Sequence, residues 1–271
     1  MLKTEMRNPR TTHIDHMPTA EMLCVIQEEN ERAAAAIRTE LSAIGQAVDA
    51  ITERMREGGR LFYIGCGTSG RLGVLDAAEC PPTYGVPYDL VNGIIAGGDG
   101  ALRRAVEGAE DSFEAGARDL AAYQITPRDS VVGISVAGGA AYVLGAFSVA
   151  REAGALCIAL TCNEGTPIER EAAIAIHPDT GAEVIAGSTR MKAGSAHKMI
   201  LNMISTAVMV KLGHVCENLM INLRPSNTKL RARIIGIVCE LAGVDPATAE
   251  TALNENDFNI RAALRALGGE A

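Results

Sequence analysis

The amino-acid sequence predicts an α/β fold: a doubly wound parallel sheet flanked by helices, with an N-terminal helical arm and a small C-terminal helical module. The first observation is an alternation of apolar strand-like segments with helix-like segments, which favours a parallel sheet covered on both faces. The second is a pair of glycine-rich turns, each directly after one of those strands. The third is the stretch from residue 226 onward, where helix-like segments follow one another without a strand.

Five strands are expected, with helices between them. The strand candidates cover residues 61–65, 89–96, 130–136, 156–161 and 172–177. The intervening helices are expected near residues 69–79, 100–123, 140–153 and 166–171. Residues 1–20 read as an extended arm, and residues 21–57 hold one or two helices that Gly58 and Gly59 end.

Three parts of the chain follow from this order. Residues 1–57 form the arm and helices that pack on the core, residues 58–224 form the sheet domain, and residues 225–271 form the C-terminal helical module. A polar loop and a long apolar helix over 187–213 close the sheet domain, and the helix is interpreted as core or dimer interface. In the last module Asp245 is expected to cap a helix that has Pro246 at its first position.

Composition excludes several classes of partner. The 271 residues carry a net charge of −8 and no basic tract, which argues against a nucleic-acid partner. Aromatic residues are 3% and Trp is absent, so a stacking platform for bases is not expected. Seven Cys without CxxC spacing indicate scattered thiols in a reducing cytoplasm rather than disulfides or a zinc site. The uncharged stretch 131–150 is long enough to span a bilayer, but Gly138 and Gly139 divide it into a strand and a helix.

The segment GCGTSG at 65–70 is a candidate anion site. It follows a strand and opens a helix, so glycines permit close approach while free N–H groups and the hydroxyls of Thr68 and Ser69 face a ligand. This arrangement suits a phosphate dianion. It fits neither a dinucleotide fingerprint nor a nucleoside-triphosphate loop, and a structural glycine turn is the alternative.

A second glycine turn, SVAGGAAY at 135–142, ends another strand. Gly138 and Gly139 again permit close approach, but Ser135 is the one hydroxyl in the turn before Tyr142. A tight strand-to-helix turn explains this segment as well as a ligand contact does.

Two carboxylates stand out. Glu79 lies near the end of a helix that Pro81 and Pro82 are expected to terminate, and the negative end of the helix dipole suits a general acid. Glu110 lies at the edge of an apolar helical stripe through Val106 and Phe113, a position that suits a general base. The alternatives are a solvated helix-end Glu79 and a boundary Glu110 held in a salt bridge.

The segment GSTRMKAGSAHK at 187–198 places hydroxyls, Arg190 and Lys192 just before a helix. These groups could close over an anionic substrate, or they could form a helix cap with exposed charges. The five His residues lack HxxxH or HExxH spacing, so no metal is assigned. Ser69 has no local His and Asp partners, so a hydrolytic triad is unsupported.

Taken together, the chain resembles the N-acetylmuramic acid 6-phosphate etherase family, which has the sugar isomerase (SIS) fold. The resemblance covers nearly the whole chain, and five segments carry it: TEMRNPRTTHIDHM near the start, GCGTSGRLGVLDAAECPPTYGV at 65–86, IAGGDGALRRAVEGAEDS at 95–112, GAEVIAGSTRMKAGSAHKMILNMIST at 181–206 and KLGHVCENLMINL at 211–223.

The resemblance implies a cytoplasmic carbon–oxygen lyase without metal or organic cofactor. Such an enzyme removes D-lactate from N-acetylmuramic acid 6-phosphate by elimination and hydration, leaving N-acetylglucosamine 6-phosphate, in cell-wall sugar recycling. By motif the acid corresponds to Glu79 of AECPPTYG and the base to Glu110 of VEGAEDS. A homodimer with no membrane contact is implied. The substrate-binding residues expected are Gly67, Thr68, Ser69, Gly70, Arg71, Ser135, Gly138, Gly139, Ser188, Thr189, Arg190 and Lys192.

The chain departs from the family at one turn. Many members carry Ser-Gly-Arg-Thr where this chain has Ala137-Gly138-Gly139-Ala140. The glucokinase regulatory protein, a relative that binds sugar phosphates without catalysis, has a similar Gly-Ile-Ser-Val run before this turn. A non-catalytic sugar-phosphate-binding regulatory module is therefore the alternative function, and a sugar-phosphate isomerase is a third.

Overall fold

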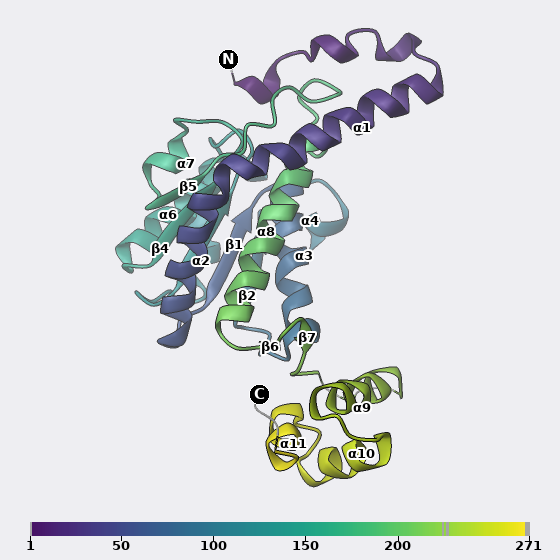
Figure 1. Cartoon of the computed structure of the whole chain (residues 1–271). Coiled ribbons are helices and arrows are strands. Elements are labelled where there is room, and N and C mark those ends of the chain that lie inside the picture. The colour runs from purple at the N-terminus through teal and green to yellow at the C-terminus, as the bar shows by residue number, and fades with distance from the viewer. Residues whose placement is uncertain (1, 224, 226–227, 269–271) are drawn as a thin grey trace. The chain divides into compact units, whose positions relative to one another are not determined.

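In the computed structural model, which describes residues 2–223, 225 and 228–268, the central element is a five-stranded parallel sheet (Figure 1). Its strand order is β2-β1-β3-β4-β5. The five predicted strands are confirmed, as β1 (Leu61–Gly65), β2 (Val91–Ile95), β3 (Ser130–Ile134), β4 (Leu156–Leu160) and β5 (Ile174–Ile176). A two-stranded antiparallel ladder joins β6 (Val215–Cys216) to β7 (Leu219–Met220).

Helices account for much of the remaining described chain. The α-helices are α1 (Thr19–Ala36), α2 (Leu41–Arg56), α3 (Gly67–Tyr84), α4 (Gly100–Arg103), α5 (Phe113–Ala121), α6 (Ala141–Glu152), α7 (Pro167–Arg170), α8 (Lys192–Lys211), α9 (Thr228–Ala242), α10 (Pro246–Glu255) and α11 (Ile260–Ala266). The short 3-10 helices are η1 (Lys3–Glu5), η2 (Pro9–Thr11), η3 (Ile14–His16), η4 (Ile37–Glu40) and η5 (Ala109–Asp111). The arm expected to be extended therefore contains three short helical turns.

The chain divides into two compact units. The first comprises Met1–Ala78 and Asp89–Val208, and the second comprises Glu79–Tyr88 and Met209–Ala271. These bounds differ from the three parts expected from the sequence, because the N-terminal helices belong with the sheet and residues 79–88 belong with the C-terminal segment.

Helices cover both faces of the sheet in the first unit (Figure 1). One face buries Phe62 and Ile64 against Tyr142 and Phe147 of α6. On the other face Gly73 of α3 lies against Tyr63, close enough that an added Cβ would stand 2.8 Å from the Tyr63 Cβ. Strands buried on both faces are continuous apolar runs, which is why their positions could be predicted from the sequence.

The prediction that Pro81 and Pro82 end the first glycine-turn helix is wrong. α3 continues through both prolines to Tyr84. A proline removes its own N–H but leaves its carbonyl, and the Gly85 N–H donates to the Pro81 carbonyl at 2.9 Å. Gly85 then adopts a φ of 66°, which stops the helix. Glu79 therefore lies before the last turn of α3. Because the effect of the helix dipole is confined to that last turn, the dipole does not favour Glu79 as a general acid.

The prediction of one helix over 100–123 is also wrong. The segment forms α4, η5 and α5 with turns between them. Gly108 has a φ of 70°, and the Ser112 side chain caps α5 by accepting the Ala115 N–H. Val106 is 48% exposed and Phe113 is 42% exposed, so these residues do not form the expected buried stripe.

The second unit holds the C-terminal helices α9, α10 and α11 around a core that includes Ile234, Leu253 and Leu264. The Asp245 side chain accepts the Ala247 and Thr248 N–H groups, and Pro246 is the first residue of α10. The predicted cap is therefore confirmed.

The uncharged stretch 131–150 is divided between strand β3 and helix α6, as its two glycines predicted. Within the described ranges, every helix is too short or too polar to cross a bilayer.

Candidate functional site

The candidate site lies in the first unit at the carboxyl ends of β1 and β3. In the strand order β2-β1-β3-β4-β5 the chain leaves β1 toward one edge and leaves β3 toward the other, and ligands of doubly wound sheets bind at this switch point. A cavity of about 330 Å³ opens there. It is lined by Glu5, Cys66, Gly67, Thr68, Ser69, Glu110, Ile134, Ser135, Val136, Ala137, Ala140 and Thr189.

The start of α3 forms one wall of this cavity. Gly67 has a φ of 52°, which turns the chain from strand into helix, and Gly70 packs so closely that an added Cβ would stand 2.5 Å from the Gly65 carbonyl oxygen. The N–H groups of a first helical turn have no intrahelical acceptor, and they carry the positive end of the dipole. With the hydroxyls of Thr68 and Ser69, this wall can bind a phosphate.

The turn after β3 forms a second wall. Ser135 is buried, and its Oγ accepts the Gly138 N–H at 3.1 Å, so the hydroxyl proton is available to a ligand. Ala137 and Ala140 line the cavity with methyl groups. They occupy two positions of the turn at which this chain departs from the family pattern.

The glycine pair of this turn has two different environments. Gly138 is buried with a φ of 70°, and an added Cβ would stand 2.3 Å from the Thr166 Cβ. Gly139 is exposed, and within the described chain nothing lies within 4 Å of its added Cβ. Neither residue is among those that line the cavity. Gly138 is therefore explained by the packing of the turn.

The segment 187–198 brings one predicted residue to the cavity. Thr189 lines it, whereas Ser188, Arg190 and Lys192 are not among its lining residues. Arg190 is exposed. The N–H groups of Lys192 and Ala193 at the start of α8 both donate to the buried Glu183 carboxylate at 2.9 Å. This helix start is thus occupied by a protein carboxylate, unlike the start of α3.

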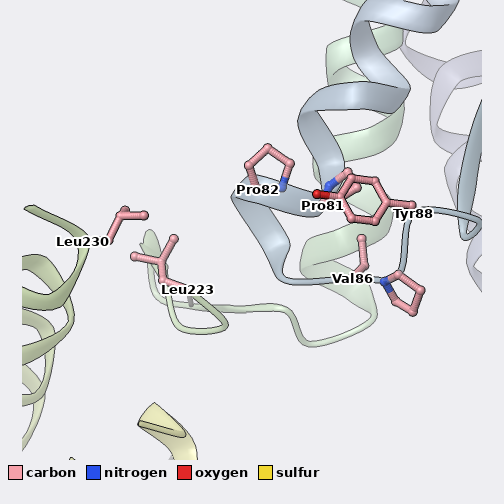
Figure 2. Close-up of a pocket in the computed structure, with 7 residues that line it drawn as sticks. Pro81, Pro82, Val86, Tyr88, Leu223 and Leu230 are labelled. Carbon is pink, nitrogen blue, oxygen red and sulfur yellow. The ribbon is translucent and has the colours of Figure 1, made fainter. Parts of the chain in front are cut away.

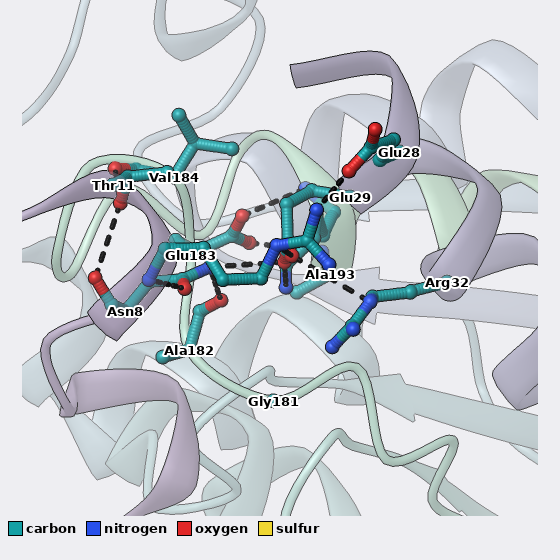
Figure 3. A network of polar contacts seen from close by, with 12 residues as sticks. Asn8, Thr11, Glu28, Glu29, Arg32, Gly181, Ala182, Glu183, Val184 and Ala193 are labelled. Carbon is teal, nitrogen blue, oxygen red and sulfur yellow. Dashed lines mark hydrogen bonds and ion pairs between the residues drawn. The ribbon is translucent and has the colours of Figure 1, made fainter. Parts of the chain in front are cut away.

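Lys192 lies in a buried charged network around Glu29 and not among the cavity residues. Figure 3 shows this network, with Glu29, Asn8 and Arg32 labelled. The Nζ of Lys192 lies 2.5 Å from Glu29 Oε2, which also accepts the Asn8 side-chain amide at 2.9 Å. Arg10 and Arg32 reach the other oxygen of Glu29, at 3.4 and 3.7 Å. Burial opposes ionisation of Glu29, but Lys192 and Asn8 outweigh it and hold its pKa below the ordinary value. Lys192 therefore ties α8 to α1.

Glu110 lines the cavity from η5. It reaches this place through the turns that interrupt the expected helix. Arg71, a predicted binding residue, donates to the carbonyls of Ala101 and Leu102 at 2.7 and 3.1 Å. Arg71 lines an adjoining cavity of about 180 Å³ that shares Gly67 and Glu110 with the first. Its guanidinium holds the end of α4 and so supports the segment that carries Glu110.

Glu79 is exposed on α3 and belongs to the second unit. Ala78, the preceding residue, lies eleven positions beyond Gly67, or about 16 Å along the helix at 1.5 Å per residue. Glu79, the predicted acid, is not among the residues that line the cavity with Glu110.

Among the cavity residues that were not predicted as site residues from the sequence, two have ionisable side chains, Cys66 and Glu5. Cys66 has a thiol whose pKa burial, with smaller contributions from Glu110 and Asp111, raises to about 12. The thiol is therefore protonated at neutral pH and is a poor nucleophile. Glu5 reaches the cavity from the N-terminal arm. Glu5 lies in the segment TEMRN, whose resemblance to the family was the sequence signal that could have pointed to it.

A separate hollow in the second unit has a different character (Figure 2). It is lined by Pro81, Pro82, Val86, Pro87, Tyr88, Leu223 and Leu230. Among these described lining residues, Tyr88 is the one with a polar side-chain group. Apart from the Tyr88 hydroxyl, the described lining of this hollow therefore lacks the carboxylates and hydroxyls that are found in the cavity at β1 and β3.

The chain is similar to known proteins over nearly its whole length. Residues 43–151 match the N-terminal SIS domain of the glucokinase regulatory protein, and residues 109–207 match the SIS domain. A protein from Clostridium beijerinckii named N-acetylmuramic acid 6-phosphate etherase is 50% identical over 97% of this chain and 86% of that protein. A protein of the same name from Yersinia pestis is 51% identical over 97% of this chain and 89% of its own length.

Solved structures support the fold. The phosphoheptose isomerase from Neisseria gonorrhoeae superposes with a TM-score of 0.51 at 20% identity, covering 70% of this chain and 98% of that one. The enzyme of the same name from Francisella tularensis gives a TM-score of 0.50 at 22% identity, covering 71% and 98%. The predicted doubly wound α/β fold of the SIS type is confirmed.

Proposed function

The chain belongs to the N-acetylmuramic acid 6-phosphate etherase family, and we propose that it cleaves the D-lactyl ether of N-acetylmuramic acid 6-phosphate to N-acetylglucosamine 6-phosphate and D-lactate. The observation that carries the proposal is one cavity that combines a phosphate-binding helix start with the carboxylate of Glu110. Identity of about half the residues over 97% of the chain supports it.

The proposed reaction is an elimination followed by hydration, which makes the enzyme a carbon–oxygen lyase. Glu110 removes the C2 proton, which is acidic because the open-chain sugar has an aldehyde at C1. The C3–O bond then breaks, its electron pair leaves with the lactate oxygen, and Glu79 donates a proton to that oxygen. Water adds across the resulting C2–C3 double bond, returning a proton to C2 and placing a hydroxyl on C3.

The phosphate takes no part in bond breaking. Its role in the proposal is to supply binding energy that holds C2 against Glu110. The start of α3, with Thr68 and Ser69, is the proposed phosphate site, and Ser135 and Thr189 are proposed to bind the adjoining sugar. Gly70 and Arg71 are proposed to act through packing, and Ser188 and Arg190 to face the mouth of the site.

We further propose a homodimer in which Glu79 serves the site of a second copy. Glu79 directly follows Ala78, and the phosphate-to-C3 span of a hexose phosphate is much shorter than the helical distance between Gly67 and Ala78 estimated above. Met203 on α8 is 37% exposed and offers apolar surface for such an association. The acidic chain with its seven free thiols suits a cytoplasmic enzyme.

The second candidate is a sugar-phosphate-binding regulatory module without turnover. The methyl groups of Ala137 and Ala140 in the cavity favour it, because they replace hydroxyls of the family pattern. The match of residues 43–151 to a regulatory protein's domain is consistent with it.

The experiment is an assay of D-lactate after mixing the purified chain with N-acetylmuramic acid 6-phosphate, with the unphosphorylated sugar as control. Release from the phosphorylated sugar alone is expected. Binding of the phosphosugar without lactate would overturn the etherase in favour of the regulatory module.

The assignment of roles has its own test. Glu79→Gln should abolish lactate release yet allow exchange of the C2 proton with solvent, whereas Glu110→Gln should lose both. Mixed subunits of the two inactive variants should regain part of the activity if Glu79 acts in the partner's site. Full lactate release by both single variants would contradict the assignment.

A further inference from the structure

The first turn of the N-terminal arm is fixed to the edge of the sheet beside the cavity. The Asn163 side chain, in the loop after β4, accepts the Lys3 N–H at 3.0 Å and donates to Thr4 Oγ at 3.0 Å. The same amide donates to the Val136 carbonyl at 2.9 Å. Thr4 is fully buried and Asn163 is 6% exposed. One buried amide thus couples η1 to the turn after β3 that lines the cavity.

This attachment delivers Glu5, the last residue of η1, into the cavity. Glu5 Oε2 lies 3.4 Å from the place that a Cβ on Gly187 would occupy, so the carboxylate sits close over the backbone of the segment that supplies Thr189. The arm therefore contributes a charged side chain to a site that is otherwise built from the sheet domain.

The polar groups that line the cavity include both hydrogen-bond donors and carboxylates. The helix start with Thr68 and Ser69 supplies donors, while Glu5 and Glu110 supply negative charge. A substrate with a phosphate and a lactate carboxylate is repelled by these carboxylates and attracted by the donors. The groups that can approach Glu5 favourably are the neutral donors of the sugar, namely its hydroxyls and the amide N–H of the acetamido group.

We infer that Glu5 is a substrate-binding residue that accepts hydrogen bonds from the neutral hydroxyl or amide donors of the amino sugar. It thereby sets the orientation in which the phosphate faces α3. Asn163 and Thr4 are positioning residues for Glu5. The inference rests on the proposed function for its substrate.

Equilibrium binding of N-acetylglucosamine 6-phosphate, measured by calorimetry, tests this without turnover. A hydrogen bond to a charged group contributes about 1.5–3 kcal/mol, so Glu5→Ala should weaken binding about 10- to 100-fold. Glu5→Gln keeps an acceptor and should lose less. Glu152→Gln, at an exposed carboxylate on α6, is the matched control and should bind as the wild type does. Unchanged binding by Glu5→Ala would overturn the inference.

A second variant tests whether Thr4 and Asn163 position Glu5. Thr4→Val keeps the shape of the buried side chain but removes the acceptor of the Asn163 amide. It should weaken binding of the product as Glu5→Ala does. The variant that combines Thr4→Val with Glu5→Ala should have about the same affinity as whichever single variant binds more weakly. Fully additive losses would contradict the positioning role. If the wild-type chain itself fails to bind this product, the proposed function fails first; if it binds but releases no lactate, the Glu5 test still stands.

Discussion

Lys192 Nζ lies 2.5 Å from Glu29 Oε2, in a pair of buried side chains separated by 163 positions in the sequence. The pair joins the first long helix to α8, whose preceding loop supplies Thr189 to the cavity. A buried ion pair adds little net stability when intact, but the loss of one partner leaves an uncompensated charge.

Lys192→Met should therefore destabilise the protein by about 3–5 kcal/mol, because the Glu29 carboxylate would stay buried without its nearest cation. Lys198→Met on the same helix is the matched control, since Lys198 is exposed, and it should change stability by less than about 0.5 kcal/mol. Urea unfolding of both variants measures the difference. Equal losses would show that the buried pair has no special role.

The pH dependence of stability should contain a contribution from His197. This side chain is fully buried, and burial lowers its pKa to about 4. In the unfolded chain it accepts a proton near pH 6.5, so between pH 6.5 and 4 the unfolded state binds more protons than the folded state. The free energy of unfolding should fall by up to about 3 kcal/mol as the pH drops through that window.

His197→Gln removes this titration, so its unfolding free energy should fall less steeply between pH 6.5 and 4.5 than that of the wild type. His13→Gln, at an exposed position, should keep the wild-type slope. Parallel slopes for wild type and His197→Gln would refute the prediction.

The adjacent glycines of the second turn should respond differently to alanine. Gly138→Ala places a Cβ at positive φ and 2.3 Å from the Thr166 Cβ, so a loss of at least about 2 kcal/mol is expected. Gly139→Ala meets open space and should stay within about 1 kcal/mol of the wild type. Thermal and urea unfolding would check both, and similar stability of the two variants would count against the described turn.

Ala140 offers a stabilising change at the same turn. It is the N-cap residue of α6 and has no side-chain cap, so Ala140→Thr should add about 1 kcal/mol by accepting an N–H group of the first turn. Ala153→Thr, at the other end of the same helix, should give no such gain. Urea unfolding measures the change, and a destabilised Ala140→Thr variant would indicate that the cavity wall does not accept the larger side chain.

The sheet could be predicted from the sequence because its strands are predominantly apolar segments that alternate with helices, with Asn92 in β2 and Ser130 in β3 as polar exceptions. The resemblance implied that Thr68, Ser69 and Ser135 bind the substrate. The structure brings all three to one cavity, because the carboxyl ends of neighbouring parallel strands meet at one edge. The break in the helix around Glu110 was not predicted. The apolar spacing of the segment favours one continuous helix, but Gly108 with its positive φ and the Ser112 cap interrupt it.

The misplaced and missed residues depend on contacts that local patterns do not reveal. Lys192 was expected to bind the substrate, and its pairing with Glu29 was not foreseen because Glu29 lies far away in sequence. Glu5 was missed because the amide that anchors its helix, Asn163, is separated from Thr4 by 159 positions. Glu79 was placed at a helix end because proline was expected to stop a helix that in fact continues to Tyr84.

The most direct test of the central claim is the rate of D-lactate release from N-acetylmuramic acid 6-phosphate by Glu110→Gln, compared with Glu114→Gln as a nearby exposed carboxylate that lines neither the cavity nor the adjoining one. If the cavity is the catalytic site, Glu110→Gln should lose about 10²- to 10⁴-fold in rate while still binding N-acetylglucosamine 6-phosphate, and Glu114→Gln should keep wild-type activity. Release at the wild-type rate by Glu110→Gln would contradict the assignment of this cavity as the site of the reaction.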